Sequence, residues 1–347
     1  MSLITSTDAL SIAALRAELW RRDHAGLGRN RRLQLIDDTS LRLELAKRGA
    51  HPEPAAWFPP TDDRKDPLCT TGLPAPLLQH ARRCCYLIGA GAVRRIAKGR
   101  VRLQHLHYGT ANSLCTDEPF WCQPSVVERR GEYVGAYGYS GYLLSRRHVL
   151  TCWHGWEQFS HQPQVAIFGY CARADCDNPT TLSEQAVYSL KLYPRSMAPG
   201  DSSGQLCPGD WVVLELQRAV DHMIVGDPPV VAAAPQGRAV YTLGYPCGLP
   251  LKLADGATIL SSGAAGFRSD LDTYTGNSGS PVFDAASHAL IGIVVEAQKD
   301  EGDFEPVPSR GCYVGNRVDS RITGQLAVPA ACFATALARI GDDYGSR

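Results

Sequence analysis

Ten short apolar segments, separated by turn-forming residues, constrain the fold of this chain most strongly. Each contains β-branched or aromatic residues and lies between Gly, Pro, Asn or Asp, which interrupt regular structure. The segments occupy residues 133–138, 141–151, 164–170, 186–193, 211–216, 239–244, 257–261, 281–283, 289–296 and 312–314. Strands of this length and spacing are typical of antiparallel barrels and sandwiches. We therefore predict a mainly β region, closed by an amphipathic helix near 329–340.

The residues that precede this region have a different sequence pattern. Apolar stripes at helical spacing predict helices over 8–23 and 33–48, within an N-terminal helical region 1–50. The stretch from His51 to Pro76 contains seven prolines, which exclude regular helix and central strand. We predict a further helix over 77–100, interrupted by glycines. This gives a Pro-rich connector with a helical segment over 51–124 and a β domain over 125–347.

Composition excludes several classes of protein. The 347 residues are 44% apolar and 20% charged, with zero net charge, so the chain can bury a core and is not generally disordered. No window of eighteen apolar residues exists, so no membrane partner is expected. Met1 to Ala14 lacks the Lys or Arg of a secretory signal. We therefore expect a cytoplasmic protein whose twelve cysteines are free thiols.

The charge distribution is uneven although the total is zero. Residues 1–110 carry 18 Lys and Arg against 10 Asp and Glu, whereas residues 111–347 carry 17 against 25. The basic run 94–102 has no interleaved aromatic residues and no known nucleic-acid motif, so nucleic acid is not expected as a partner. His105, His107, Cys115 and Cys122 have metal-ligand side chains, but their spacing fits no compact zinc site. We expect no metal and no cofactor.

Three local patterns in the β region carry the chemistry. The first is an apolar hairpin that ends at His154, and the second is Asp210 at the start of a buried apolar strand. The third is the segment Gly276-Asn-Ser278-Gly-Ser-Pro281, followed by another apolar strand. A serine needs a general base, and the base needs a third group that fixes its tautomer. Glycines beside the serine allow backbone N–H groups to face a developing oxyanion.

His154, Asp210 and the Gly276–Pro281 segment resemble the trypsin-like (chymotrypsin-fold) serine peptidases. The serine segment is most similar to the bacterial branch that includes the V8-type glutamyl endopeptidases and the HtrA-like proteases. The run Ala239-Val-Tyr-Thr-Leu-Gly-Tyr-Pro-Cys-Gly-Leu-Pro250 is also similar to that branch. The resemblance covers about residues 125–340. It implies two six-stranded antiparallel β-barrels with the site between them, behind a small, mainly α-helical N-terminal region.

The resemblance also implies roles for individual residues. Ser278 is the nucleophile, His154 the general base and Asp210 the group that orients it. The N–H groups of Gly276 and Ser278 form the oxyanion hole. The strand that ends in Val294, Val295 and Glu296 pairs with the substrate backbone.

Other positions depart from the secreted trypsins. Gly155 follows His154 where those enzymes have a cysteine, and Asn277 replaces the Asp that pairs with a newly cut N-terminus. Asp272 and Thr273 precede Ser278 where trypsins bind a basic side chain. We therefore expect cleavage after Arg or Lys, with Glu or a small apolar residue as the alternative.

Three functional hypotheses remain at this point. The first is a serine endopeptidase acting on a protein or peptide, recruited or regulated through residues 1–124 within a bacterial signalling or defence assembly. The second is a peptide-binding scaffold on a protease fold, without catalysis. The third makes residues 1–124 the main functional part, as an interaction domain that places the peptidase.

Overall fold

A computed structural model describes most of the β region and part of what precedes it. The described residues are 64–107, 132–134, 138–172, 181–193, 209–221, 229–263, 266–296, 304–307, 312–315 and 325–345. The helices predicted over 8–23 and 33–48 lie outside these residues. β17 (Phe304–Val307) and β18 (Cys312–Gly315) form an antiparallel pair in a unit separate from the other described elements.

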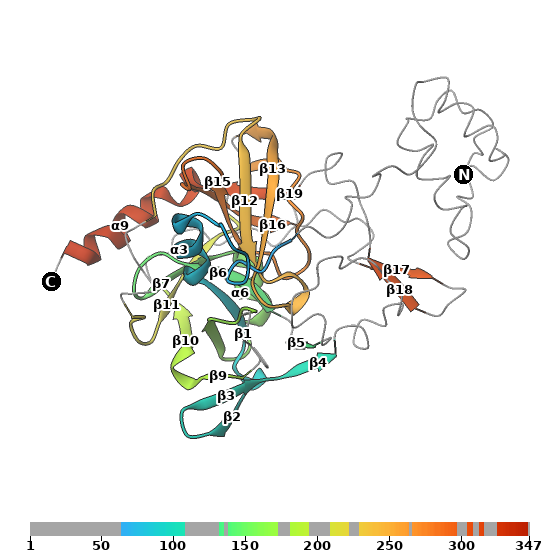
Figure 1. The fold of residues 1–347 in the computed structure, drawn as a ribbon. Coiled ribbons are helices and arrows are strands. Elements are labelled where there is room, and N and C mark those ends of the chain that lie inside the picture. The colour runs from blue at the N-terminus through green and yellow to red at the C-terminus, as the bar shows by residue number, and fades with distance from the viewer. Residues whose placement is uncertain are drawn as a thin grey trace, which may run out of the picture. The chain divides into compact units, whose positions relative to one another are not determined.

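The described residues form two closed, six-stranded antiparallel barrels (Figure 1). The first has the order β1 (Cys84–Gly89), β6 (Gly138–Leu143), β7 (His148–Thr151), β11 (Val212–Leu216), β10 (Val187–Leu192) and β8 (Gln164–Phe168). The second has the order β12 (Ala239–Gly244), β13 (Lys252–Gly263), β14 (Gly266–Ser269), β19 (Gln325–Pro329), β16 (Leu290–Glu296) and β15 (Pro281–Asp284). The prediction of a mainly β protein with two six-stranded barrels is confirmed.

The first barrel begins earlier in the chain than the sequence predicts. Of the predicted helix over 77–100, only the end of α3 (Ala75–Arg83) is α-helical, and Ala90–Ala92 form one turn of 3-10 helix. From Cys84 the prediction is wrong, because the six-residue run Cys84–Gly89 is buried along its whole length as β1. A short, uniformly apolar run has no period that distinguishes a strand from a buried helix. A barrel strand therefore lies ahead of residue 125, where the sequence placed the start of the β domain.

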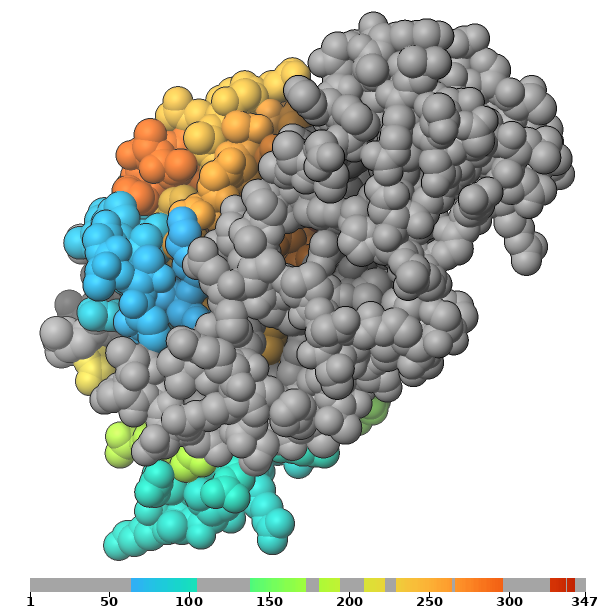
Figure 2. Space-filling model, turned by 45° about the vertical axis from the view of Figure 1, so that its right-hand side comes forward, coloured from blue at the N-terminus to red at the C-terminus, as the bar shows by residue number. Residues whose placement is uncertain are grey.

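The basic run forms a hairpin instead of helix. β2 (Val93–Ala97) and β3 (Arg100–Leu103) pair across Lys98 and Gly99, and β9 (Thr181–Ser183) pairs with β3. Gly99 has a φ of +72°, which a glycine adopts without steric cost in a tight turn. Figure 2 shows this three-stranded sheet at the surface, where its cationic side chains are exposed.

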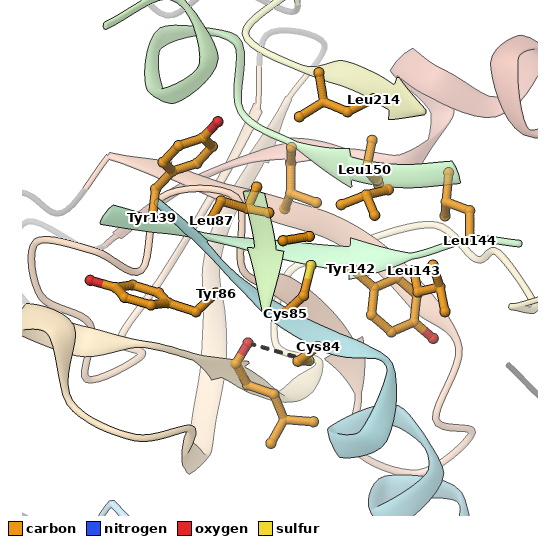
Figure 3. Close-up of a cluster of buried hydrophobic side chains, with 14 of the residues drawn as sticks. Cys84, Cys85, Tyr86, Leu87, Tyr139, Tyr142, Leu143, Leu144, Leu150 and Leu214 are labelled. Atoms are coloured by element: carbon orange, nitrogen blue, oxygen red, sulfur yellow. Dashed lines mark hydrogen bonds between the residues drawn. The ribbon is translucent and has the colours of Figure 1, made fainter. Parts of the chain in front are cut away.

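Apolar and aromatic side chains fill the first barrel and its contact with the second (Figure 3). Cys85, Leu87, Leu150 and Leu214 are fully buried there. The ring of Tyr142 packs edge-on against Phe283 of the second barrel, with centroids 5.4 Å apart. Burial of this kind is the main favourable term in folding, so the barrels act as one rigid support for the loops between them.

Helices also lie before the first barrel and after the second. α3 packs on β1, and its buried Arg83 donates hydrogen bonds to the carbonyl oxygens of Leu143 and Leu144. After β19, a short 3-10 helix (Ala330–Phe333) leads into α9 (Ala334–Gly345), near the predicted C-terminal helix. No helix among the described residues has the length and apolar character needed to cross a membrane.

Candidate active site

His154 lies at the start of a short helix directly after β7. The helix, α6 (Trp153–Phe159), begins after Cys152, and Thr151 fixes the end of the strand through an Oγ1 hydrogen bond to the carbonyl of Ser140. Gly155 is buried, and a Cβ at this position would lie 2.7 Å from the ring of Tyr139. Only a glycine lets α6 pack this closely on β6. Gly155, which stands where the secreted trypsins have a cysteine, is therefore required for packing.

Asp210 is brought to His154 by the pairing of β7 with β11. Val212 of β11 lies opposite Thr151 of β7, so the antiparallel register places Asp210 beside the residues that follow β7. The carboxylate binds His154 twice: Oδ1 accepts from the backbone N–H at 3.0 Å, and Oδ2 lies 2.8 Å from Nδ1. This arrangement holds the imidazole with Nδ1–H toward Asp210 and leaves Nε2 as the acceptor.

Two other aspartates, Asp201 and Asp221, lie close to Asp210 in the sequence. Asp201 lies outside the described residues. Asp221 is exposed, and no hydrogen bond joins it to His154 within the described part of the chain. The structure therefore pairs His154 with Asp210.

Ser278 lies in a tight loop between two glycines with left-handed backbone. Gly276 has a φ of +96° and Gly279 a φ of +84°. A Cβ on Gly279 would lie 2.1 Å from the carbonyl oxygen of Ser140, and one on Gly276 would lie 2.5 Å from that of Tyr245. Both positions therefore require glycine for conformation and for space.

This serine loop is fixed to both barrels. Ser140 of β6 donates its N–H to the carbonyl of Ser278 at 2.8 Å and its hydroxyl to the carbonyl of Gly276 at 2.7 Å. On the other side, Gly279 donates to the carbonyl of Val294 at 2.7 Å. Sequence reasoning did not single out Ser140 for this role, because the bonds join residues far apart in the chain.

The loop packs against the backbone from which His154 projects. The position of a Cβ on Gly279 would be 3.1 Å from the backbone nitrogen of Cys152. Ser278 is partly exposed, but no hydrogen bond joins its Oγ to His154 in the described structure. Nε2 of His154 instead lies 3.7 Å from Sγ of Cys152.

The predicted oxyanion hole keeps its donors available. Within the described residues, no hydrogen bond uses the N–H groups of Gly276 or Ser278. These N–H groups can therefore donate to an incoming oxyanion.

The predicted substrate-binding residues lie in two places. Asp272 is partly exposed, and its Oδ2 lies 3.8 Å from Nε of the buried Arg64. Thr273 is fully buried, and no group in the described part of the chain hydrogen-bonds to its Oγ1. The sequence pattern did not point to Arg64, which precedes both barrels.

The second group of substrate-binding residues ends β16. Val294 uses its N–H for Ser280 and its carbonyl for Gly279, so its hydrogen bonds hold the serine loop. Val295 falls within an irregularity of the β16–β19 pairing, between Val294 and Glu296. Val294 and Glu296 pair with Ala327 and Leu326 of β19, so only Val295 is left out of this ladder.

The comparison with protein-family models agrees with this fold. Residues 139–293 match the family model of the trypsin-like peptidase domain. This segment contains His154, Asp210 and Ser278, and the match supports a trypsin-like peptidase fold. No curated relative matches the sequence.

Among solved structures, the chain is similar to the active form of the Rv3671c protease from M. tuberculosis, with 14% identity and a TM-score of 0.40 over 77% of this chain and 84% of that one. It is also similar to Deg5, with 14% identity and a TM-score of 0.36 over 64% and 83% of the two chains. The protease domain of MamO from Magnetospirillum magneticum matches with 14% identity and a TM-score of 0.36 over 57% and 87%.

Proposed function

We propose that this protein is a serine endopeptidase that cleaves peptide bonds through Ser278, His154 and Asp210. The observation that carries the proposal is the double contact of Asp210 with His154, beside a serine loop fixed by Ser140. Oγ of Ser278 attacks the scissile carbonyl carbon, and its proton passes to Nε2 of His154. The tetrahedral oxyanion receives hydrogen bonds from the N–H groups of Gly276 and Ser278. His154 then protonates the leaving amine, and water hydrolyses the acyl-enzyme by the same route.

The test uses the full-length protein and a fluorophosphonate, which forms a covalent bond with activated serines. We expect the adduct on the peptide that contains Ser278, together with cleavage of a peptide library. Ser278→Ala and His154→Ala should each lower kcat by about 10⁴–10⁶-fold, and the double variant should be no worse. Ser262→Ala, at an exposed serine of the second barrel, serves as the control.

Two outcomes would reject the proposal. The first is near-wild-type turnover by Ser278→Ala. The second is binding of library peptides with neither an adduct nor cleavage, which would favour the non-catalytic scaffold.

We propose further that the peptidase cleaves after Arg or Lys. The support is the contact of Asp272 with the Arg64 guanidinium, since this carboxylate already accepts a group of the chemistry that a P1 arginine carries. Oδ1 of Asp272 has no hydrogen-bond donor among the described residues. A P1 profile of the wild-type protein that favours Glu or small apolar residues would contradict this.

The cellular setting is also a proposal. We propose that the protein works in a bacterial cytoplasm, where Cys84, Cys85, Cys152 and Cys332 remain thiols, as in the structure. Mass spectrometry that finds two or more native disulfides in the protein as isolated from its cell would contradict this.

Residues 1–124 are proposed to recruit or restrain the peptidase within a signalling or defence assembly. The support is the excess of basic residues over 1–110, opposite in sign to the rest of the chain. Limited proteolysis of the folded, full-length protein ahead of Arg64 tests the restraint. An unchanged kcat/KM after the cut would contradict it.

A further inference from the structure

Cys152 lies two residues before His154 and contacts the nitrogen that catalysis needs. Its Sγ is 3.7 Å from Nε2 of His154, within hydrogen-bond distance for sulfur. The thiol is 0% exposed, so the protein fixes its position. The residue is therefore held in place against the imidazole, and no substrate group reaches its sulfur.

Nε2 is the only acceptor of the neutral His154 ring. Oδ2 of Asp210 lies 2.8 Å from Nδ1, so the proton of the neutral ring is on Nδ1. The lone pair of Nε2 then accepts one hydrogen bond. The S–H of Cys152 is a weak donor placed to make it, and the O–H of Ser278 must make it during catalysis. In the described structure Nε2 of His154 contacts Sγ of Cys152 and makes no hydrogen bond to Oγ of Ser278.

We infer that Cys152 is a positioning residue that competes with Ser278 for Nε2 of His154 and sets the pH range in which His154 serves as a base. This inference rests on the proposed function. The competing step is a proton transfer: the S–H bond of Cys152 breaks, an N–H bond forms at Nε2, and the electron pair remains on sulfur. The products are a thiolate and an imidazolium, and the imidazolium cannot accept the proton of Ser278.

The groups around the His154 ring change its pKa. The pKa of His154 is raised above its usual value, mainly by negative charge on Cys152. Burial opposes the rise, and the hydrogen bond to Asp210 adds to it. Tyr139 of β6 also faces Cys152, but burial raises the pKa of its hydroxyl so far that it stays neutral. The net effect is that His154 loses its proton at a higher pH than it would without the thiol.

The test is the pH profile of kcat/KM for the full-length protein and for Cys152→Ala. We expect the acid limb of Cys152→Ala at lower pH, with kcat/KM below the wild-type limb higher by about tenfold for each pH unit of displacement. Cys85→Ala is the matched control, because it removes another fully buried thiol, which lies in the core of the first barrel (Figure 3). It should leave the limb unchanged. Superimposable acid limbs for wild type and Cys152→Ala would overturn the inference.

A second measurement does not depend on activity. NMR titration of the His154 imidazole in Ser278→Ala, with and without Cys152→Ala, reports the competition directly. We expect the imidazole to lose its proton at lower pH in the double variant. An unchanged titration would overturn the inference even for an active enzyme. If Cys152→Ala lowers the pKa of His154 but the wild-type protein has no peptidase activity, the proposed function is rejected while the effect of Cys152 on His154 stands.

Discussion

The guanidinium of Arg64 lies against the carboxylate of Asp272, with 3.8 Å between Nε and Oδ2. The Arg64 side chain is only 1% exposed, whereas that of Asp272 is 35% exposed, and the Arg64 guanidinium also lies 4.6 Å above the ring of Tyr274. Lys65, the next residue, exchanges backbone hydrogen bonds with Leu253 of β13. The cation is therefore anchored to the second barrel, and under the proposed specificity a basic P1 side chain would meet a carboxylate that already has a partner.

Arg64→Met should raise the preference for Arg and Lys at P1 severalfold, because it returns the full charge of Asp272 to the substrate. Asp272→Ser should lower kcat/KM for these substrates, with a loss of transition-state stabilisation of about 2–4 kcal/mol, since it removes the charge partner of a desolvated cation. P1 profiling of both variants measures the effects.

Lys65→Met is the control for Arg64→Met, because it removes a neighbouring cation whose partner is Asp255. An equal loss of activity on every substrate in the Asp272 variant would make Asp272 a structural residue.

Asp210→Asn should lower kcat by about 10⁴-fold, because an amide at this position stabilises the wrong tautomer of His154. Steady-state kinetics on the best peptide measures the loss, and circular dichroism checks the fold. Asp221→Asn, at an exposed aspartate after β11, should retain wild-type rates. If Asp221→Asn loses activity and Asp210→Asn keeps wild-type rates, Asp210 does not orient the base.

Gly279→Ala should destabilise the protein by more than about 4 kcal/mol, because the added methyl group meets the carbonyl of Ser140 in a backbone with positive φ. Gly256→Ala separates the effect of the positive φ from the effect of the close contact. Gly256 has a φ of +77° but open space around it, so it should cost only about 1–2 kcal/mol. Urea unfolding measures both free energies. Equal losses would show that the close contact at Gly279 relaxes.

Asp284 should make stability depend on pH. Burial raises the pKa of this carboxyl, but hydrogen bonds from Arg238 and from the turn at Ser287 outweigh it and lower the pKa from 3.8 to about 2. A depressed folded-state pKa stabilises the protein above the unfolded value, and this contribution is lost as the pH falls toward 2. Asp284→Asn should therefore reduce the free energy of unfolding by about 2 kcal/mol near neutral pH and by progressively less between pH 4 and 2. A pH-independent difference would contradict this.

The strand-rich half of the fold followed from the sequence because its signals are local. Short β-branched segments between turn residues predicted an antiparallel barrel or sandwich. The resemblance to the trypsin-like peptidases implied two six-stranded barrels, and these are present. The Gly-rich serine segment required no tertiary information either, since φ values of +96° and +84° fall on its two glycines. The prediction of helix was wrong at Cys84–Gly89 because a short apolar run has no period that separates strand from helix.

Residue types and their order were enough to predict strands and turns, because alternation and tight turns depend on neighbours in the chain. Through the resemblance to the trypsin-like peptidases they also implied two barrels and nominated His154, Asp210 and Ser278. Tertiary structure alone decided which groups touch. The β7–β11 register brings Asp210 to His154, Ser140 holds the serine loop, and Arg64 meets Asp272. These contacts arise from strand pairing and packing between distant segments, which no local pattern specifies.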